Sequence, residues 1–194
     1  NRDPSGEPFP SVEATSLAGE TVEIPEDFAG APVLLLVGYV QDTQFDIDRW
    51  LYGAIDAELE VALREVPAAR GAAASLAKGF IDSGMQRGIP RDEWGAVTTT
   101  YGDAAEAIGQ FTGTERPRNA RVLLLDSNGI VRWFYDQGYS AMKLKGLEAA
   151  LEDVSAPDTA PAPTMIAGRS AFVRKSSAAF GILVTVLEPA PSQL

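Results

Sequence analysis

The chain of 194 residues contains neither cysteine nor histidine. Without cysteine it can form no disulfide, no thiolate metal site and no thiolate nucleophile, and cysteine usage gives no information on its redox compartment. Without histidine it has no imidazole base, no Ser-His-Asp arrangement and no histidine-bound zinc. These two absences exclude most hydrolase, thiol-redox and zinc-enzyme chemistries.

Clustered basic charge and long apolar runs are also missing. The 27 acidic and 16 basic side chains give a formal charge of -11, which argues against nucleic acid and anionic membrane surfaces as partners. No apolar run approaches the roughly 20 residues of a membrane-spanning helix. Neither a G-x-G-x-x-G nor a Walker pattern occurs, so no phosphate loop is present. We predict no cofactor, no metal, no nucleic acid partner and no direct membrane span.

The clearest fold signal lies in residues 31–59. Residues 33–37 form an unbroken apolar run, typical of a strand buried on both faces of a sheet. A polar loop over residues 40–43 follows it. Apolar residues then recur at the spacing of one helix face. They are Ile47, Trp50, Leu51, Ala54 and Ile55.

Other elements are predicted on both sides of this strand and helix. Alternating apolar positions predict an edge hairpin over 9–24, and a second parallel strand over 59–66 is expected to stop at Pro67. The Ala-rich residues 68–86 predict a helix with an apolar face that includes Leu76 and Phe80. Residues 97–101 are β-prone, and Asp103 is a plausible N-cap for the next helix.

The strongest local signal is Asn128-Gly129 between the apolar runs 121–126 and 130–135. Asn-Gly tolerates positive φ at both residues, so it predicts an antiparallel hairpin. Ser140 then caps a last helix with a leucine stripe. The predicted fold class is α/β, with a central mixed sheet between helices.

The composition divides the chain into four parts. Residues 1–8 form an N-terminal stub, residues 9–154 the domain, residues 155–164 a proline-rich linker and residues 165–194 an extended tail with a β-prone segment. The start at Asn1 suits a chain from which a signal or anchor segment was removed, and equally a chain trimmed for another reason. The first alternative predicts an extracytoplasmic location, periplasmic or at a membrane-associated face.

The order of these elements resembles the thioredoxin-like superfamily over residues 8–154, which implies a three-layer sandwich with an added C-terminal tail. Within it, short pieces are similar to the mitochondrial ATP synthase assembly factor family with a thioredoxin-like fold. The matching pieces are Phe9-Pro10 with residues 16–20, the strand before Pro67 with residues 78–80, and residues 125–129 with residues 131–133 and 138–139. The resemblance implies an assembly or accessory role.

Redox members of this superfamily differ from the chain at their reactive positions. Thr43 and Asp46 stand where the two cysteines would fall, and Ala120 stands where the cis-proline would fall. Pro117 lies three residues earlier. Thiol-disulfide exchange needs a thiolate, so both halves of the redox site are absent.

Three further groups of residues have a functional and a structural interpretation. Asp42, Asp46 and Asp48 resemble a cation cluster, but they lack the spacing of a calcium loop, and acids favour the first turn of a helix. Residues 133–135 are aromatic and could stack a ligand, although strand aromatics usually pack in the core. Arg116, Arg118 and Arg121 could grip an anion, although such a loop is usually solvated. We favour the structural interpretation of each group.

Three functions follow from these observations. We favour a non-catalytic accessory, assembly or structural subunit of a larger, membrane-associated complex of the respiratory, photosynthetic or ATP synthase type. The alternatives are a small-molecule carrier or chaperone that uses a groove around Tyr39, Phe45 and Trp133, and a degenerate peroxidase or reductase.

The tail carries candidate partner-binding side chains. They are Phe172, Phe180, Ile182, Leu183, Val184 and Val186. This segment could add a strand to the protein's own sheet edge or dock on a neighbouring subunit. We favour the neighbouring subunit.

Overall fold

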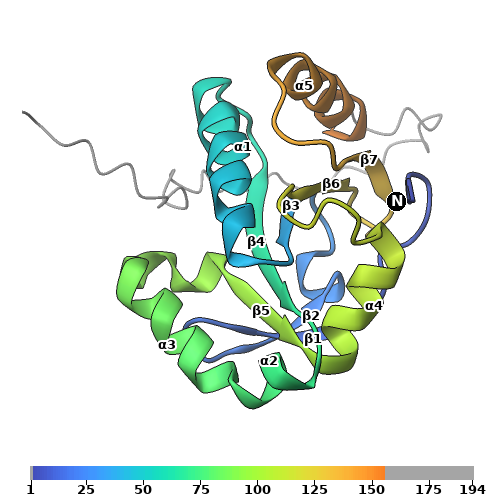
Figure 1. The fold of residues 1–194 in the computed structure, drawn as a ribbon. Helices are drawn as coiled ribbons and strands as arrows, with labels where there is room; N and C mark the ends of the chain where they lie inside the picture. The colour runs from blue at the N-terminus through green and yellow to red at the C-terminus, as the bar shows by residue number, and fades with distance from the viewer. Residues whose placement is uncertain (1, 156–194) are drawn as a thin grey trace, which may run out of the picture.

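The computed structural model describes residues 2–155, which form one mixed sheet covered by helices (Figure 1). Its strands are β1 (Val12–Ser16), β2 (Thr21–Ile24), β3 (Val33–Gly38), β4 (Ala62–Ala69), β5 (Thr98–Tyr101), β6 (Arg121–Leu125) and β7 (Val131–Tyr135). Its α-helices are α1 (Gln44–Asp56), α2 (Ala72–Leu76), α3 (Lys78–Gly88), α4 (Gly102–Thr112) and α5 (Ala141–Ser155). None of the helices in this part of the chain is long and apolar enough to cross a membrane.

The sheet has the order β2-β1-β5-β4-β3-β6-β7. Strands β3 and β4 are parallel, as are β4 and β5, whereas β6 and β7 run antiparallel at one side and β1 and β2 at the other. The hairpins β1-β2 and β6-β7 and the parallel pair β3-β4 confirm the sequence-based predictions. The expected α/β class with a central mixed sheet is therefore correct.

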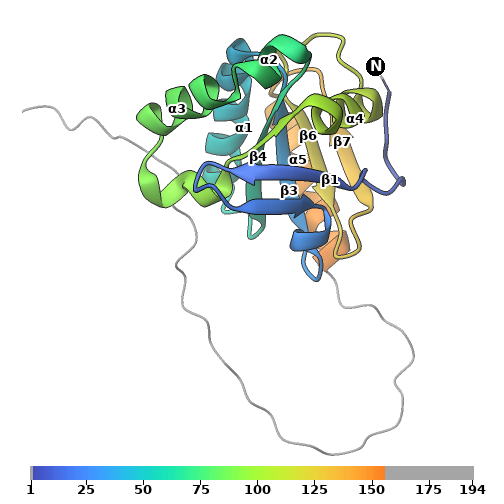
Figure 2. The ribbon, with the colours of Figure 1, turned by 90° about the horizontal axis from the view of Figure 1, so that it is seen from below.

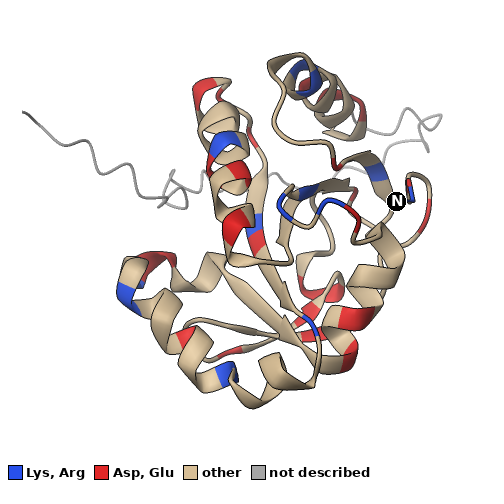
Figure 3. Cartoon of the chain, viewed as in Figure 1, with Lys and Arg blue, Asp and Glu red and all other residues tan. Residues whose placement is uncertain are grey.

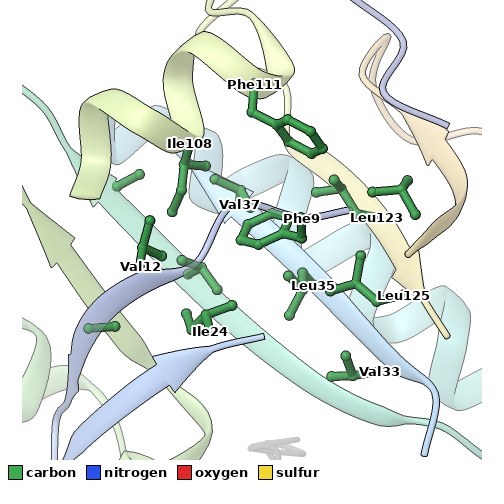
Figure 4. Packing of buried hydrophobic residues seen from close by; sticks show 14 of the residues in the cluster. Phe9, Val12, Ile24, Val33, Leu35, Val37, Ile108, Phe111, Leu123 and Leu125 are labelled. Carbon is green, nitrogen blue, oxygen red and sulfur yellow. The ribbon is translucent and has the colours of Figure 1, made fainter. Parts of the chain in front are cut away.

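Strand β3 lies at the centre and divides the core into two layers. All six of its residues are buried, and alternate side chains point to opposite faces. Val33, Leu35 and Val37 pack with α4 and with Phe9 (Figure 4), whereas Leu34 and Leu36 pack with α1 and α5. Figure 2 shows the sheet between these helices. This is the three-layer sandwich that the resemblance implied.

The N-terminal segment is joined to the sheet edge. The Gly6 N–H donates to the Val131 carbonyl at 2.7 Å, and the Val131 N–H donates to the Glu7 carbonyl at 2.9 Å. Pro8 forms an isolated bridge with Ile130. Residues 6–8, which the sequence assigns to a stub, thus cover the start of β7.

Two predicted boundaries differ from the structure. Pro67 does not stop β4, which continues to Ala69, because Pro67 lies opposite Gly38, the last residue of β3, where few ladder hydrogen bonds are still needed. Asp103 is not the N-cap of α4. The helix begins at Gly102, so Asp103 lies in its first turn, where a carboxylate also favours the helix dipole.

The Ala-rich segment is helical, but its expected apolar face is exposed. The chain breaks it into α2 and α3, in which Leu76 is 90% and Phe80 77% exposed. Helix α3 instead contacts its neighbours through polar side chains spaced four residues apart. Lys78 donates to Thr15 Oγ1, Asp82 accepts from the Tyr101 hydroxyl, and Gln86 donates to the Leu17 carbonyl.

The β6-β7 turn differs from the predicted Asn-Gly turn, in which both residues could have positive φ. Only Gly129 has positive φ, at 76°. The Asp126 carboxylate accepts hydrogen bonds from the N–H groups of Asn128 and Ile130, at 2.8 and 3.0 Å, and so fixes the turn. A β-bulge lies between Leu124 and Leu125. The hairpin is confirmed, but an aspartate and one glycine make its turn.

Replacing Gly129 by Val should destabilise the domain by roughly 1–3 kcal/mol. The substitution puts a β-branched residue at positive φ, and its Cβ would lie 2.7 Å from Pro25 Cγ. Urea denaturation measures the loss. Gly19 also has positive φ but open space around it, so Gly19→Val is the matched control and should cost less. If both variants lost the same free energy of unfolding, the contact with Pro25 would not be the cause.

Candidate functional site

The junction between β3 and α1 is hydrogen-bonded to the loop that precedes β6. The Thr43 hydroxyl donates to the Pro117 carbonyl at 2.8 Å, and the side chain of Thr43 is almost fully buried. Thr43 ends the 3₁₀ helix η2 (Gln41–Thr43), directly before α1. Its hydroxyl is therefore committed to a backbone contact at the first of the two expected redox positions.

Asp46, the second expected redox position, is hydrogen-bonded to Ala120, the third. One carboxylate oxygen accepts the Ala120 N–H at 2.8 Å, and the other accepts the Tyr139 N–H at 2.7 Å. The side chain is buried in the first turn of α1. A carboxylate that accepts two backbone N–H groups replaces hydrogen bonds to water with stronger fixed ones. The structure thus brings Thr43, Asp46 and Ala120 together, with Asp46 as a structural acceptor.

The three arginines near this loop do not form a shared anion site. Arg121 is fully buried, and its guanidinium donates to the carbonyls of Gly113, Glu115, Arg116 and Asn119. Its burial lowers the pKa of Arg121 from the usual value. Arg121 is therefore not part of a solvated loop. The backbone of residues 113–119 is curled, and its carbonyl oxygens, which are not paired with a strand, accept the hydrogen bonds of the guanidinium.

The three aspartates of the proposed cation cluster have different partners. Asp42 forms an exposed ion pair with Arg118 at 3.2 Å, and Asp48 accepts from Gln44 at 2.9 Å, whereas Asp46 binds backbone. Within residues 2–155, no three acidic side chains are grouped so that they could hold a metal ion. The preference of acidic residues for the first turn of a helix accounts for Asp46. The three aspartates do not form a cation cluster.

Trp133 and Tyr135 of β7 pack between this strand and α1, whereas Phe134 packs on the opposite face of the sheet. The Trp50 ring lies edge-on to the rings of Trp133, Tyr135 and Tyr139, with centroids 5.3 to 5.9 Å apart. Trp133 therefore belongs to the core on the α1 and α5 side. The expected groove around Tyr39, Phe45 and Trp133 does not exist as one surface, since only Tyr39 and Phe45 line the cleft described next.

A cleft of about 1160 Å³ lies between the start of α1, β4 and α3. Its apolar lining includes Phe45 and Phe80, which are 72% and 77% exposed, together with Ile81 and Met85. We call this surface the α1–α3 cleft. None of the residues 113–120 lines it, but Thr43, which donates to Pro117, does.

The charged side chains of the α1–α3 cleft are all acidic. They are Asp42, Asp48, Glu65 and Glu93. Figure 3 shows acidic positions on α1 and on the neighbouring part of β4. Burial raises the pKa of Glu65 to about 7. The hydrogen bond from Gln44 lowers this pKa, and the nearby charge of Asp48 makes a smaller contribution that raises it.

Sequence reasoning placed Tyr39 and Phe45 in a groove but missed Glu65 and the exposure of Phe80, for identifiable reasons. Glu65 is a charged residue in a strand in which apolar and charged residues alternate, a pattern that predicts a solvent-facing side chain. Phe80 was assigned to a buried helix face, although the polar series Lys78, Asp82 and Gln86 has the same helical spacing. That series was the available signal for the orientation of α3.

Comparison with known proteins finds similar structures. No family model matches the chain, and no curated protein matches it. BsSco, described as a member of the Sco family of cytochrome c oxidase assembly proteins, gives a TM-score of 0.55 at 10% identity over 79% of this chain and 98% of that one. A SCO1/SenC family lipoprotein from Bacillus anthracis gives 0.54 at 13% identity, with the same coverage. The fold is thioredoxin-like.

A third thioredoxin-like neighbour is the pneumococcal exposed lipoprotein thioredoxin from Streptococcus pneumoniae. Its TM-score is 0.52 at 10% identity, over 72% of this chain and 98% of that chain. At such identities the likeness establishes the fold and no activity. The thioredoxin-like fold that the resemblance implied is therefore confirmed.

Replacing Asp46 by Ala should destabilise the thioredoxin-like domain by about 2–4 kcal/mol. The substitution leaves two backbone N–H groups, of Ala120 and Tyr139, without their acceptor, and each loss costs roughly 1–3 kcal/mol. Urea denaturation measures the change. Asp56 lies exposed at the end of the same helix, so Asp56→Ala is the control and should change stability by less than about 0.5 kcal/mol. Similar losses in both variants would contradict the role of Asp46.

Proposed function

We propose that this protein is a non-catalytic thioredoxin-like subunit that assists or stabilises a larger, membrane-associated protein complex. The observation that carries the proposal is the use of Asp46. At the helix start, where redox members of this fold hold a reactive cysteine, both carboxylate oxygens accept backbone N–H groups. The position holds three segments together and offers no thiolate for exchange.

The comparisons support an assembly role for such a domain. One structural neighbour is described as a member of a family of cytochrome c oxidase assembly proteins. The short motifs of this chain resemble a family of ATP synthase assembly factors. We infer a partner complex of the respiratory, photosynthetic or ATP synthase type. Two neighbours are described as lipoproteins, which supports an extracytoplasmic place at a membrane-associated face.

The binding segment in this proposal is the C-terminal tail, which lies outside the described residues. Its β-prone part contains Ile182, Val184 and Val186 at alternate positions, so an extended conformation puts them on one side. Alternate apolar side chains of this kind suit strand addition to a partner's sheet edge or insertion into its pockets. Phe180, two residues before Ile182, supplies an aromatic anchor.

Replacing Ile182 and Val184 by Ser in the full-length chain should reduce its co-purification with a membrane complex at least ten-fold. The two substitutions remove the apolar side chains that we assign to the partner interface. The measurement is quantitative mass spectrometry of the tagged protein, isolated from mildly solubilised membranes of its native cells.

The matched control is Met142→Ser, because Met142 is also apolar and is 80% exposed, but lies on α5. It should leave co-purification unchanged. Both variants should melt at the same temperature as the parent, because Met142 is exposed and the proposal assigns Ile182 and Val184 to a partner interface. The proposal is wrong if the tail variant keeps its partners, or if the parent protein enriches no set of membrane-complex subunits over an untagged control.

A further inference from the structure

The α1–α3 cleft combines apolar walls with acidic side chains. Gln44 Nε2 lies 2.9 Å from an Asp48 oxygen and 3.5 Å from a Glu65 oxygen, so it links the two carboxyl groups. Neither carboxyl group forms an ion pair with a Lys or Arg of residues 2–155. Among residues 2–155, no basic side chain lines the cleft. Its chemistry therefore suits an extended segment with an apolar side chain followed by a cation.

The walls of the cleft indicate how such a segment would bind. Phe45 on α1 and Phe80 on α3 are both largely exposed. Covering an exposed phenylalanine side chain removes apolar surface from water, which favours binding. A cation beside Glu65 would also offset the cost of ionising this half-buried carboxyl group. Apolar burial and charge pairing thus favour the same occupant.

The chain itself contains a segment with this chemistry, beyond the described residues. Phe172-Val173-Arg174-Lys175 places an aromatic residue two positions before a guanidinium, so in an extended conformation Phe172 and Arg174 point to the same side. All three basic residues of 156–194 lie between 169 and 175. The segment is therefore complementary to the cleft in charge and in apolar pattern.

The connecting chain is long enough. Residues 156–171 can span about 50 Å when extended, whereas a domain of this size is on the order of 40 Å across. Helix α5, which ends at Ser155, packs on the same face of the sheet as α1, whose first turn borders the cleft. The segment can thus reach the cleft without crossing to the far face of the sheet.

We propose that residues 172–175 of the same chain occupy the α1–α3 cleft, with Phe172 between Phe45 and Phe80 and Arg174 beside Asp48 and Glu65. This contact anchors the tail on its own domain and presents residues 180–187 from a fixed place. The inference does not depend on the proposed function, because it concerns a contact within one chain and different residues of the tail.

The absence of cysteine allows a direct test by disulfide trapping in the full-length chain. Gly84→Cys puts a thiol on the cleft side of α3, where an added Cβ meets nothing within 4 Å, and Ser176→Cys puts one directly after the segment. Gly79 lies on the same helix, has equally open space and does not line the cleft. Gly79→Cys with Ser176→Cys is therefore the matched control.

In dilute protein under a glutathione redox buffer, the Gly84 pair should form its intrachain disulfide at least ten times faster than the Gly79 pair. Docking raises the effective concentration of the two thiols, whereas an undocked tail reaches both positions similarly. Thiol blocking followed by non-reducing electrophoresis and mass spectrometry measures both rates. Equal rates would overturn the proposal. A disulfide formed only between chains would overturn it as well and assign the cleft to a second copy.

The charge contact is tested in the Gly84 pair. Arg174→Glu together with Lys175→Glu should slow its disulfide formation to the rate of the Gly79 pair. Asp48→Asn together with Glu65→Gln should slow it in the same direction while keeping the shape of the cleft. The assignment of Arg174 is overturned if both charge variants keep the fast rate. Thermal melting of each variant confirms that the domain is folded.

Discussion

The two hydrogen bonds of the Asp46 carboxylate hold the start of α1 against the segments that precede β6 and α5. They join the first turn of α1 to the backbone of Ala120, directly before β6, and to Tyr139, directly before α5. Thr43 adds a bond from the same turn to Pro117. Because α1 and α5 cover one face of the sheet together, these contacts fix how that layer sits on β3. The close packing of Tyr139 on Gly53 depends on the same arrangement.

This constraint also explains why a thioredoxin-like fold persists here without thiol chemistry. The fold needs its helix start tied to the loop before β6, and a buried carboxylate can serve this purpose through backbone N–H groups. Beside this junction lies the α1–α3 cleft, which has Phe45 and Phe80 at its walls and acidic side chains in its lining.

Sequence reasoning succeeded where the signal was local. The buried run of β3, the helix α1 and the hairpin around Gly129 each follow from the spacing of apolar residues or from turn chemistry within a few positions. It failed where a tertiary contact decides. Pro67 stays within β4 because β3 ends opposite it, and Phe80 is exposed because the polar face of α3 contacts β1 and β5. Ile55 has the spacing of the α1 core face but lies near the helix end, where it is 37% exposed.

The sequence by itself determined that this protein has no thiol, no imidazole and a strongly acidic surface, since composition does not depend on folding. It also determined the order of strands and helices, because periodicity acts over short distances. Only the tertiary structure decided the role of Asp46, whose partners lie 74 and 93 residues away. The same holds for the burial of Arg121 and the meeting of Asp48 with Glu65. These contacts depend on how β3, β4 and β6 pair, and no local pattern encodes which distant backbone group a buried side chain will meet.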